Sequence, residues 1–225
     1  MAVPPGKDGK VNPNVLVTAK LIGVTEIYKM GGAQAIAALA FGTATVPKVE
    51  KITGPGNIFV TLAKKAVIGH VDIDMLAGPS EILIVADDSA NPTYLAADLL
   101  SQAEHDPLAC AILITDSERV AKAVSEEIEV QLAQLPRKEI AGTSLQQAGK
   151  IILAQDMATV IEMANLSAPE HLEIMTKAPF EIMPYIRNAG AMFLGAYSPE
   201  PLGDYYAGPN HVLPTGGTAK FYSVL

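Results

Sequence analysis

The stretch ILIVADDSANPTYLAADLLSQAEH, residues 82–105, joins a strand to a helix and ends on polar side chains. Residues 82–86 are an uninterrupted apolar run, which is typical of a strand buried on both faces. Asn91 and Pro92 then predict the start of a helix, with asparagine as the N-cap and proline in the first turn. A buried strand followed directly by a helix is the repeating unit of a parallel α/β sheet, so this stretch decides the fold class.

The end of this helix carries the first candidate metal ligands. Pro107 ends or kinks any helix at that point, because proline lacks the N–H that a helix interior requires. Gln102 and His105 are three residues apart, so they lie on one face near the helix end. An amide oxygen and a neutral imidazole can both bind a divalent metal. The segment alone leaves two interpretations open, a metal site or a helix end whose polar residues face water.

The rest of the chain repeats the alternation of strands and helices. Strands are expected at residues 24–30, 49–52, 71–75, 82–86, 111–114, 151–153, 172–175 and 192–194. Helices are expected at residues 15–21, 33–40, 58–68, 92–105, 118–135, 157–165 and 180–188, followed by loop after Gly195. This alternation predicts parallel sheets with helical crossovers.

Two sheets of modest size suit these elements better than one. We therefore predict an α/β fold of two incomplete Rossmann-like domains, each a mainly parallel sheet flanked by helices. The expected domains are residues 1–78 and 79–225, because glycine and proline cluster at residues 77–81.

Composition and charge narrow the function classes. The chain has 225 residues, a net charge of −8, 5% aromatic residues and no tryptophan. A nucleic-acid partner is not expected, because there is no basic cluster and no aromatic stacking platform. A membrane location is not expected, because no apolar run reaches the ~18 residues of a span. The single cysteine, Cys110, suits a reducing compartment and is expected to pack as a small hydrophobe, so we expect a cytoplasmic protein.

Other polar residues also gather where elements are expected to end. Glu170 and His171 precede a strand, and Asp204 and His211 lie in the last loop. A Glu–His pair on a loop can be an acid–base pair or two surface residues, and Asp204 can bind a metal or cap a turn. The residues alone do not decide between these alternatives.

The loop Gly54-Pro55-Gly56-Asn57 lies between an expected strand and an expected helix. Such a loop can bind a phosphate at the helix N-terminus. It lacks the third glycine of the dinucleotide-binding fingerprint, however, and tight turns need glycine in any case. By itself it is a weak nucleotide signal.

Motifs in a fixed order make the sequence similar to a known family. They are GGAQAIAALAFG at 31–42, GPGN at 54–57, AGPSE at 77–81, SQAEH at 101–105, APEH at 168–171 and GPNHVLPT at 208–215. The chain resembles histidinol dehydrogenase from about Pro4 to its last residue. This resemblance implies a zinc-dependent, NAD-linked homodimer that oxidises L-histidinol through the aldehyde to L-histidine, the last step of histidine biosynthesis.

The resemblance also implies roles for individual residues. The implied zinc ligands, which also contact substrate, are Gln102, His105 and Asp204. The implied acid–base residues are Glu170 and His171. Residues implied to contact the substrate L-histidinol also include Ser80, His171 and His211. Residues implied to contact NAD are Gln34 and Asn57.

Two further features of the family find no match in this chain. The resemblance implies a fourth zinc ligand, a histidine from the other subunit, and a substrate-binding glutamate in a later segment. It also implies an N-terminal segment with a tyrosine that contacts NAD. We therefore expect this chain to correspond to the central part of the enzyme. The alternative is a folded fragment with weak ligand binding and no catalysis. A third hypothesis, a zinc hydrolase with Glu170 as base, fits the ligand types but assigns no role to Gln34 and Asn57.

Overall fold

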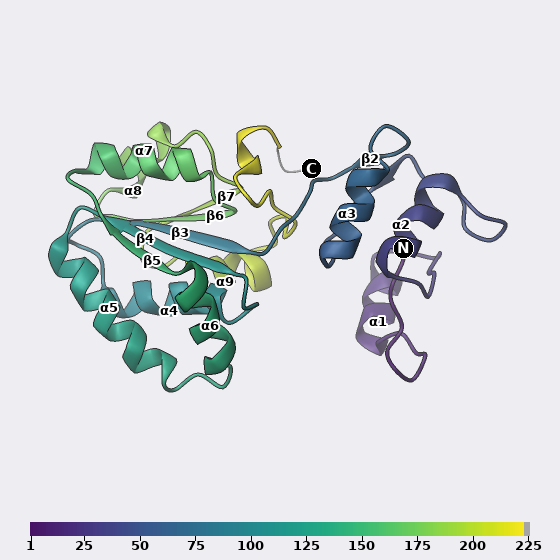
Figure 1. The fold of residues 1–225 in the computed structure, drawn as a ribbon, viewed down its shortest axis with the longest axis horizontal. Coiled ribbons are helices and arrows are strands. Elements are labelled where there is room, and N and C mark those ends of the chain that lie inside the picture. Colours follow the sequence, from purple (N-terminus) through teal and green to yellow (C-terminus); the bar gives the residue numbers. More distant parts are fainter. Residues whose placement is uncertain (223–225) are drawn as a thin grey trace. The chain divides into compact units, whose positions relative to one another are not determined.

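The computed structural model describes residues 1–222 and has two compact units, Met1–Leu76 and the part from Ala77 onward (Figure 1). The strands in both units pair in parallel and helices flank them, so the predicted α/β class is confirmed. The division lies after residue 76, whereas the expected first domain ran to residue 78. The reason is local, because the Gly78 N–H donates to the Thr215 hydroxyl and ties this loop to the second unit.

The first unit is a two-stranded parallel sheet with three helices. Its elements are α1 (Pro13–Leu21), α2 (Gly32–Phe41), β1 (Lys51–Ile52), α3 (Ile58–Ala66) and β2 (Asp72–Ile73). Asn12 caps α1, because its side chain accepts the Asn14 N–H at 2.9 Å. Ile36, Ala40 and Ile52 form the core with residues of the α3–β2 connection.

The prediction of a strand at residues 24–30 is wrong. Tyr28 forms only one isolated bridge, to Ala2, and the other residues of this segment have no strand partner in residues 1–222. Alternating polar and apolar residues suit a half-exposed loop as well as a strand, and only pairing distinguishes them. The strands expected at residues 49–52 and 71–75 exist but are only two residues long.

The second unit is a five-stranded parallel sheet in the order β5-β4-β3-β6-β7. Its strands are β3 (Glu81–Ala86), β4 (Cys110–Thr115), β5 (Lys150–Leu153), β6 (His171–Met175) and β7 (Ala191–Leu194). Counted from β3, this is the order 3-2-1-4-5 of a doubly wound sheet, whose strand order reverses between β3 and β6. Ile82 lies opposite His171 in that central pair, which fixes the register.

Helices cover both faces of this sheet (Figure 1). One face packs against α4 (Pro92–Ala103), α5 (Glu118–Leu132) and α6 (Lys138–Ala148), and the other against α7 (Met157–Ser167) and α8 (Pro179–Ile182). Ile82 and Ile84 point to the α4 side, and Leu83 and Val85 to the α7 side, as the alternation of a strand requires. The rest of the chain adds the turns η1 (Met183–Tyr185), α9 (Glu200–Leu202), η2 (Gly203–Ala207) and η3 (Thr218–Lys220).

Three expectations in the second unit are corrected. The helix expected at 118–135 ends at Leu132, and α6 after it was not predicted. The helix expected at 180–188 is one short turn plus a 3-10 turn, because Pro184 interrupts it. The segment after Gly195 is not all loop, since residues 200–207 are helical.

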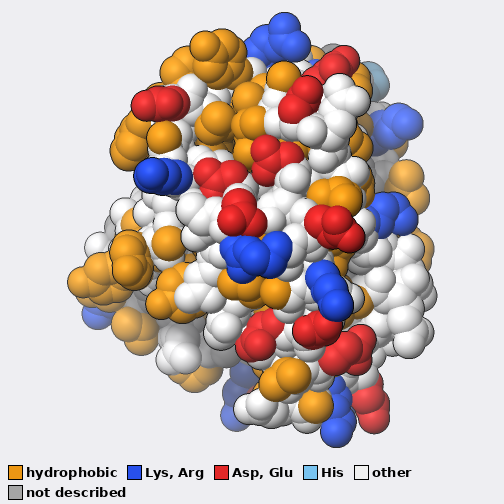
Figure 2. Space-filling model, turned by 90° about the vertical axis from the view of Figure 1, so that its left-hand side faces the viewer, with side chains coloured by type: hydrophobic (Ala, Val, Ile, Leu, Met, Phe, Trp, Pro, Cys, Tyr) orange, Lys and Arg blue, Asp and Glu red, His pale blue; other side chains and the backbone are white. Residues whose placement is uncertain are grey.

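Figure 2 views the molecule from the left-hand side of Figure 1, where α5 lies. On this face lysine and arginine side chains lie among aspartate and glutamate side chains, with apolar side chains between them. The face therefore carries mixed charge rather than a continuous basic area. Among the described residues, no helix is both long and apolar enough to cross a membrane.

Candidate active site

Polar side chains of the second unit gather at the amino ends of β3 and β6. Glu170 and His171 stand at the start of β6, and Ser80 and Glu81 at the start of β3, which is its neighbour in the sheet. The Glu81 N–H donates to Oε2 of Glu170 at 2.9 Å, and the Ser80 side chain also hydrogen-bonds this carboxyl. Glu170 and His171 are both buried, so the pair is held in place on a rigid sheet.

His171 has one ring nitrogen that is fully engaged. Its Nδ1 lies 3.0 Å from the backbone carbonyl of Glu81 and 3.0 Å from Oε1 of Gln102 on α4. A backbone carbonyl can only accept, so Nδ1 carries the proton and Nε2 carries the lone pair. Nε2 is buried and has no hydrogen-bond partner within the described residues. The imidazole is therefore oriented as a base whose free nitrogen faces the interior of the site.

The helical segment from Glu200 to Ala207 supplies the opposite wall of the site. Glu200 and Asp204 are four residues apart, so their carboxyl groups lie on one helical face. Oε1 of Glu200 lies 3.8 Å from Nε2 of His171, and both atoms lack a hydrogen bond. Oδ1 of Asp204 lies 2.9 Å from Nδ1 of the exposed His211. One ligand atom each from His171, Glu200 and Asp204 falls within 4.8 Å of the others, which is close enough for one metal ion.

Two more carboxyl groups lie behind this wall. Glu173 is completely buried on β6, on the same face as His171 because the two are two residues apart. Its Oε1 accepts the Glu200 N–H at 2.8 Å, which fastens the helical segment to the sheet. Asp98 lies one turn before Gln102 on α4, and its carboxyl interacts with that of Glu173. A small region of the interior therefore holds several acidic groups, and none of them forms an ion pair with a lysine or arginine among the described residues.

Burial is the largest cause of the pKa shifts in this cluster. It raises the pKa of Glu170 to about 8 and that of Glu200 to about 8, and nearby carboxylates add to both shifts. It raises the pKa of Asp98 to about 6 and that of Glu173 well above the usual range. Burial also lowers the pKa of His171, which keeps the imidazole neutral at neutral pH.

Asp204 is the exception among these acids. Burial raises its pKa, but hydrogen bonds from Glu200 and His211 outweigh that effect, and the pKa of Asp204 lies below its usual value. The shared proton therefore resides on Glu200 and the negative charge on Asp204. An ionised carboxylate is a suitable ligand for a metal cation.

The first unit contains a separate cavity of about 520 Å³. Two glycine-containing segments line it, Gly31-Gly32 at the start of α2 and residues 54–57 before α3. Asn57 caps α3, since its side chain accepts the N–H groups of Phe59 and Val60. Two helix N-termini therefore face one cavity, which is a favourable environment for an anionic group.

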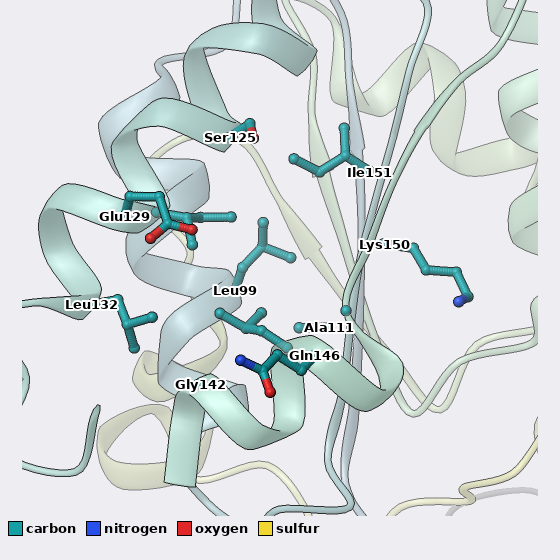
Figure 3. A pocket seen from close by; sticks show the side chains of 12 residues that line it. Leu99, Ala111, Ser125, Glu129, Leu132, Gly142, Gln146, Lys150 and Ile151 are labelled. Carbon is teal, nitrogen blue, oxygen red and sulfur yellow. The ribbon is translucent and has the colours of Figure 1, made fainter. Parts of the chain in front are cut away.

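Another hollow lies among α4, α5, α6 and the β4–β5 edge, with a volume of about 330 Å³ (Figure 3). Leu99, Leu132 and Ile151 point into it, and Glu129 and Gln146 lie at its rim, while the Lys150 side chain extends away. Its lining contains no histidine, cysteine or aspartate. Glu129 is its only carboxylate, so it lacks the combination of an imidazole and several carboxyl groups found around His171.

Comparison with known proteins identifies the family. The family model for histidinol dehydrogenase matches residues 1–225. This chain belongs to the histidinol dehydrogenase family. The histidinol dehydrogenases of Clostridium acetobutylicum and Bacillus subtilis are 62% and 59% identical over 225 residues. They cover 100% of this chain, which spans 52% and 53% of their own lengths, so it corresponds to about half of each relative.

Solved structures agree with the family membership. The histidinol dehydrogenase of Elizabethkingia anophelis matches 100% of this chain and 52% of its own chain, with a TM-score of 0.96 and 47% identity. A propionaldehyde dehydrogenase from Clostridium phytofermentans matches 92% of this chain and 60% of its own, with a TM-score of 0.54 and 12% identity. The second likeness concerns the fold alone.

The residues that the histidinol dehydrogenase resemblance singled out are not all in one place. Around the amino ends of β3 and β6 lie Ser80, Gln102, Glu170, His171, Asp204 and His211. His105 is exposed in the turn after α4, near enough for its charge to lower the pKa of His171. Gln34 and Asn57 belong to the first unit, where Asn57 lines the cavity and Gln34 lies beside Gly32.

Sequence reasoning missed Asp98, Glu173 and Glu200. Each carried a signal, because Asp98 precedes Gln102 by four residues, Glu173 follows His171 by two, and Glu200 precedes Asp204 by four. Those spacings place each residue on the same face as a residue already suspected. Charged residues at buried positions are rare enough to be informative once the face is known.

Proposed function

We propose that this chain is the part of an NAD-linked, zinc-dependent enzyme that oxidises L-histidinol through the aldehyde to L-histidine. The observation that carries the proposal is the convergence of Gln102, Glu170, His171 and Asp204 at one end of the sheet, in a chain of the histidinol dehydrogenase family. We also propose that the full protein is a homodimer and works in the cytoplasm, as the family resemblance implies.

The residues of the site fit a zinc ion. Two buried polar atoms, Nε2 of His171 and Oε1 of Glu200, face each other at 3.8 Å without hydrogen bonds, which buried polar atoms normally have. We assign the zinc to Gln102, His105 and Asp204, as the family resemblance implies, because imidazole nitrogen and carboxylate oxygen are ligands that zinc prefers. The free atoms of His171 and Glu200 lie in the wall beside these ligands, where we assign Nε2 of His171 to proton transfer. Bound zinc supplies positive charge that holds and polarises the amino alcohol.

The cavity of the first unit fits the phosphate-bearing part of NAD. Its volume of about 520 Å³ and the two helix N-termini suit a ligand of that size and charge. A side chain at position 56 would collide with Val60 at 2.5 Å, so glycine keeps this loop close to α3. Asn57 and Gln34 are the residues we assign to NAD, which accepts hydride in each oxidation step.

The protein residues divide the proton transfers between them. His171 holds its Nδ1 proton against the Glu81 carbonyl, so Nε2 is free to remove the proton of the alcohol as hydride leaves carbon. Glu170, with a pKa of about 8, is poised to gain and lose a proton near neutral pH. We assign it the activation of water that hydrates the aldehyde before the second oxidation. Ser80 and His211 are assigned to substrate binding.

The experiment is to measure NADH formation by the natural full protein with L-histidinol, NAD and zinc. His171→Asn is expected to lower kcat about 10²–10⁴-fold, because that is the usual loss when a general base is removed. His70→Asn is the matched control, since His70 is an exposed histidine of the first unit. Equal rates for His171→Asn and the control would contradict the role of His171.

Glu170→Gln separates the two oxidation steps. The variant is expected to lose NADH formation from histidinol by about 10²-fold or more. It should still reduce histidinal to histidinol with NADH, because that direction needs no activated water. Glu126→Gln, on the exposed face of α5, is the control. Loss of both directions would assign Glu170 to both steps and contradict this division.

The second candidate is a folded fragment without catalysis, which the coverage of about half of each relative favours. Catalytic zinc sites usually have three strong ligands, and an amide oxygen is a weaker one than those common in such sites. We therefore expect the 225-residue chain alone to bind zinc weakly and to form negligible NADH. Turnover by this chain equal to that of the natural full protein would exclude this candidate.

A further inference from the structure

The first unit contains one buried ion pair, between Lys64 on α3 and Asp74 directly after β2. The two residues are 3% and 4% exposed, whereas every other Lys/Arg–carboxylate pair among residues 1–222 is exposed. A buried ion pair is weak evidence for stability, because desolvation offsets most of the attraction between the charges. The role of this pair is therefore better judged from the groups that its two side chains bind.

Both side chains hold the same residue, Gly54. Oδ2 of Asp74 accepts the Gly54 N–H at 2.7 Å, and Nζ of Lys64 donates to the Gly54 carbonyl at 2.9 Å. The ion pair thus binds the donor and the acceptor of one backbone residue. The remaining Asp74 oxygen accepts the Met75 N–H at 2.7 Å, so the carboxylate is itself fixed to the chain.

Gly54 is the first residue of the loop that we assign to NAD. Its φ of +116° is a conformation that residues other than glycine rarely adopt. Because glycine is also free to adopt many other conformations, the direction in which the loop leaves β1 depends on the groups that hold Gly54. At its other end the loop is held by Asn57, which caps α3. Residues 54–57 line the cavity between these two fixed points.

We infer that Lys64 and Asp74 are a positioning pair for the cofactor, acting through the orientation of Gly54 rather than by touching NAD. The inference rests on the proposed function of the cavity and adds residues that the family resemblance did not single out. A loop that is already ordered binds its ligand more tightly, because binding no longer has to order it. Lys64 is buried with its ammonium group engaged by Gly54 and Asp74, so it is not available to bind a phosphate itself.

The test is NAD binding to variants of the natural full protein, measured by calorimetry. Asp74→Asn removes the negative charge and leaves Lys64 buried without its counter-ion. We expect its Kd for NAD to rise at least about tenfold, which corresponds to about 1.4 kcal/mol. In turnover assays KM for NAD should rise in parallel, while kcat and KM for histidinol stay near their wild-type values.

Asp72→Asn is the matched control, because it makes the same change two residues earlier. Asp72 pairs with Lys51 at 3.0 Å on the surface, with side chains 68% and 40% exposed. An exposed pair contributes little to stability, and Lys51 lines the cavity, so freeing its positive charge does not disfavour an anionic ligand. This variant should therefore bind NAD no more weakly than the wild type. An equal effect of Asp72→Asn and Asp74→Asn would overturn the inference.

A double variant, Lys64→Met with Asp74→Leu, distinguishes positioning from a structural role. Apolar replacement of a buried ion pair usually preserves the fold, which thermal unfolding verifies. If the pair positions the loop, the folded double variant still binds NAD at least about tenfold more weakly, because Gly54 has lost both partners. Faster hydrogen exchange at the Gly54 and Gly56 amides should accompany the loss. NAD binding restored to the wild-type level would overturn the inference.

Asn57→Ala distinguishes failure of this inference from failure of the proposed function. If wild-type protein binds NAD and Asn57→Ala binds it weakly, the cavity is the cofactor site. Unchanged binding by Asp74→Asn and the double variant would then overturn only the positioning role. If Asn57→Ala and the Asp74 variants all bind like the wild type, both the cofactor assignment and the inference are overturned.

Discussion

The two nitrogens of His171 lie in different environments, and this difference determines what the residue can do. Nδ1 is held by a carbonyl and by the Gln102 amide, whereas Nε2 faces Glu200 without a hydrogen bond. A ring fixed through one nitrogen loses little freedom when the other takes up a proton. We therefore expect Gln102 to orient the base in addition to the metal binding proposed for it.

The proposed zinc ligands differ from the one set of His, Asp and Glu side chains that lies close enough to bind a metal ion among the described residues, His171, Glu200 and Asp204. Substitutions can distinguish the two sets. His105→Ala is expected to lower zinc affinity at least about tenfold, because the loss of a residue that only supports a ligand already lowers metal affinity by about that factor. Glu200→Gln should change affinity little, since we place Glu200 beside the ligands. Competition with a chromogenic chelator measures both, and a larger loss in Glu200→Gln would make Glu200 the ligand.

At the residue scale, sequence reasoning found the side chains that stand at element ends and missed those inside elements. Glu170 and Asp204 were visible because their segments also contain glycine, proline or histidine. Glu173 lies within the apolar strand β6, and Glu200 lies in a segment expected to be loop. Burial of an acid depends on what packs above it, and a single strand does not contain that information.

At the element scale, α6 shows why a helix can escape detection. Its inward residues include Ala141 and Ser144, so it buries small side chains and lacks the large apolar stripe of an amphipathic helix. Gly142 lowers its helix propensity further. By contrast, the predicted helices α4 and α5 begin at side-chain caps, the expected Asn91 and Ser117.

Gly142→Ala is expected to stabilise the second unit. Gly142 lies inside α6, and a Cβ there would meet only Leu132, at 3.9 Å, which is an ordinary contact. Replacing such a glycine by alanine raises the free energy of unfolding by about 0.5–1 kcal/mol, because the unfolded chain loses freedom. Urea unfolding followed by circular dichroism measures the change.

Gly149→Ala, at the end of the same helix, should have the opposite effect. A Cβ at position 149 would lie 2.6 Å from the Leu145 carbonyl oxygen, so the backbone must move. The free energy of unfolding should therefore fall. If both substitutions destabilised the unit equally, the space beside Gly142 would be smaller than these distances indicate.

At the scale of the whole second unit, the candidate site lies at an unusual edge of the sheet. In doubly wound sheets ligands usually bind at the carboxyl ends of the strands, where the strand order reverses. Here the order reverses between β3 and β6, but Glu81, Glu170 and His171 stand at the amino ends of these strands. The alternation of elements predicts the parallel pairing of the strands. The strand order, and the edge that carries the chemistry, depend on packing that includes where α4 and residues 200–207 end.

The buried acids predict how the stability of the metal-free protein depends on pH. Folded-state pKa values of about 6 for Asp98 and about 8 for Glu170 and Glu200 lie above the unfolded values of ~4. Stability from such groups is complete below pH ~4 and is lost as pH rises through the folded pKa values. His171 acts oppositely, because its lowered pKa costs stability only as pH falls below ~6.5.

Between pH 6.5 and 8.5 the acids therefore dominate, and the free energy of unfolding should fall by an amount on the order of 1 kcal/mol or more. Glu173→Gln should lessen this fall, because it replaces an acid whose pKa is raised well above its usual range by a neutral amide that still accepts the Glu200 N–H. Glu126→Gln, on the exposed face of α5, should leave the slope unchanged. Urea unfolding at several pH values measures all three proteins. A wild-type stability that rises over this interval, or equal slopes for Glu173→Gln and the wild type, would show that these acids are not neutral in the folded state.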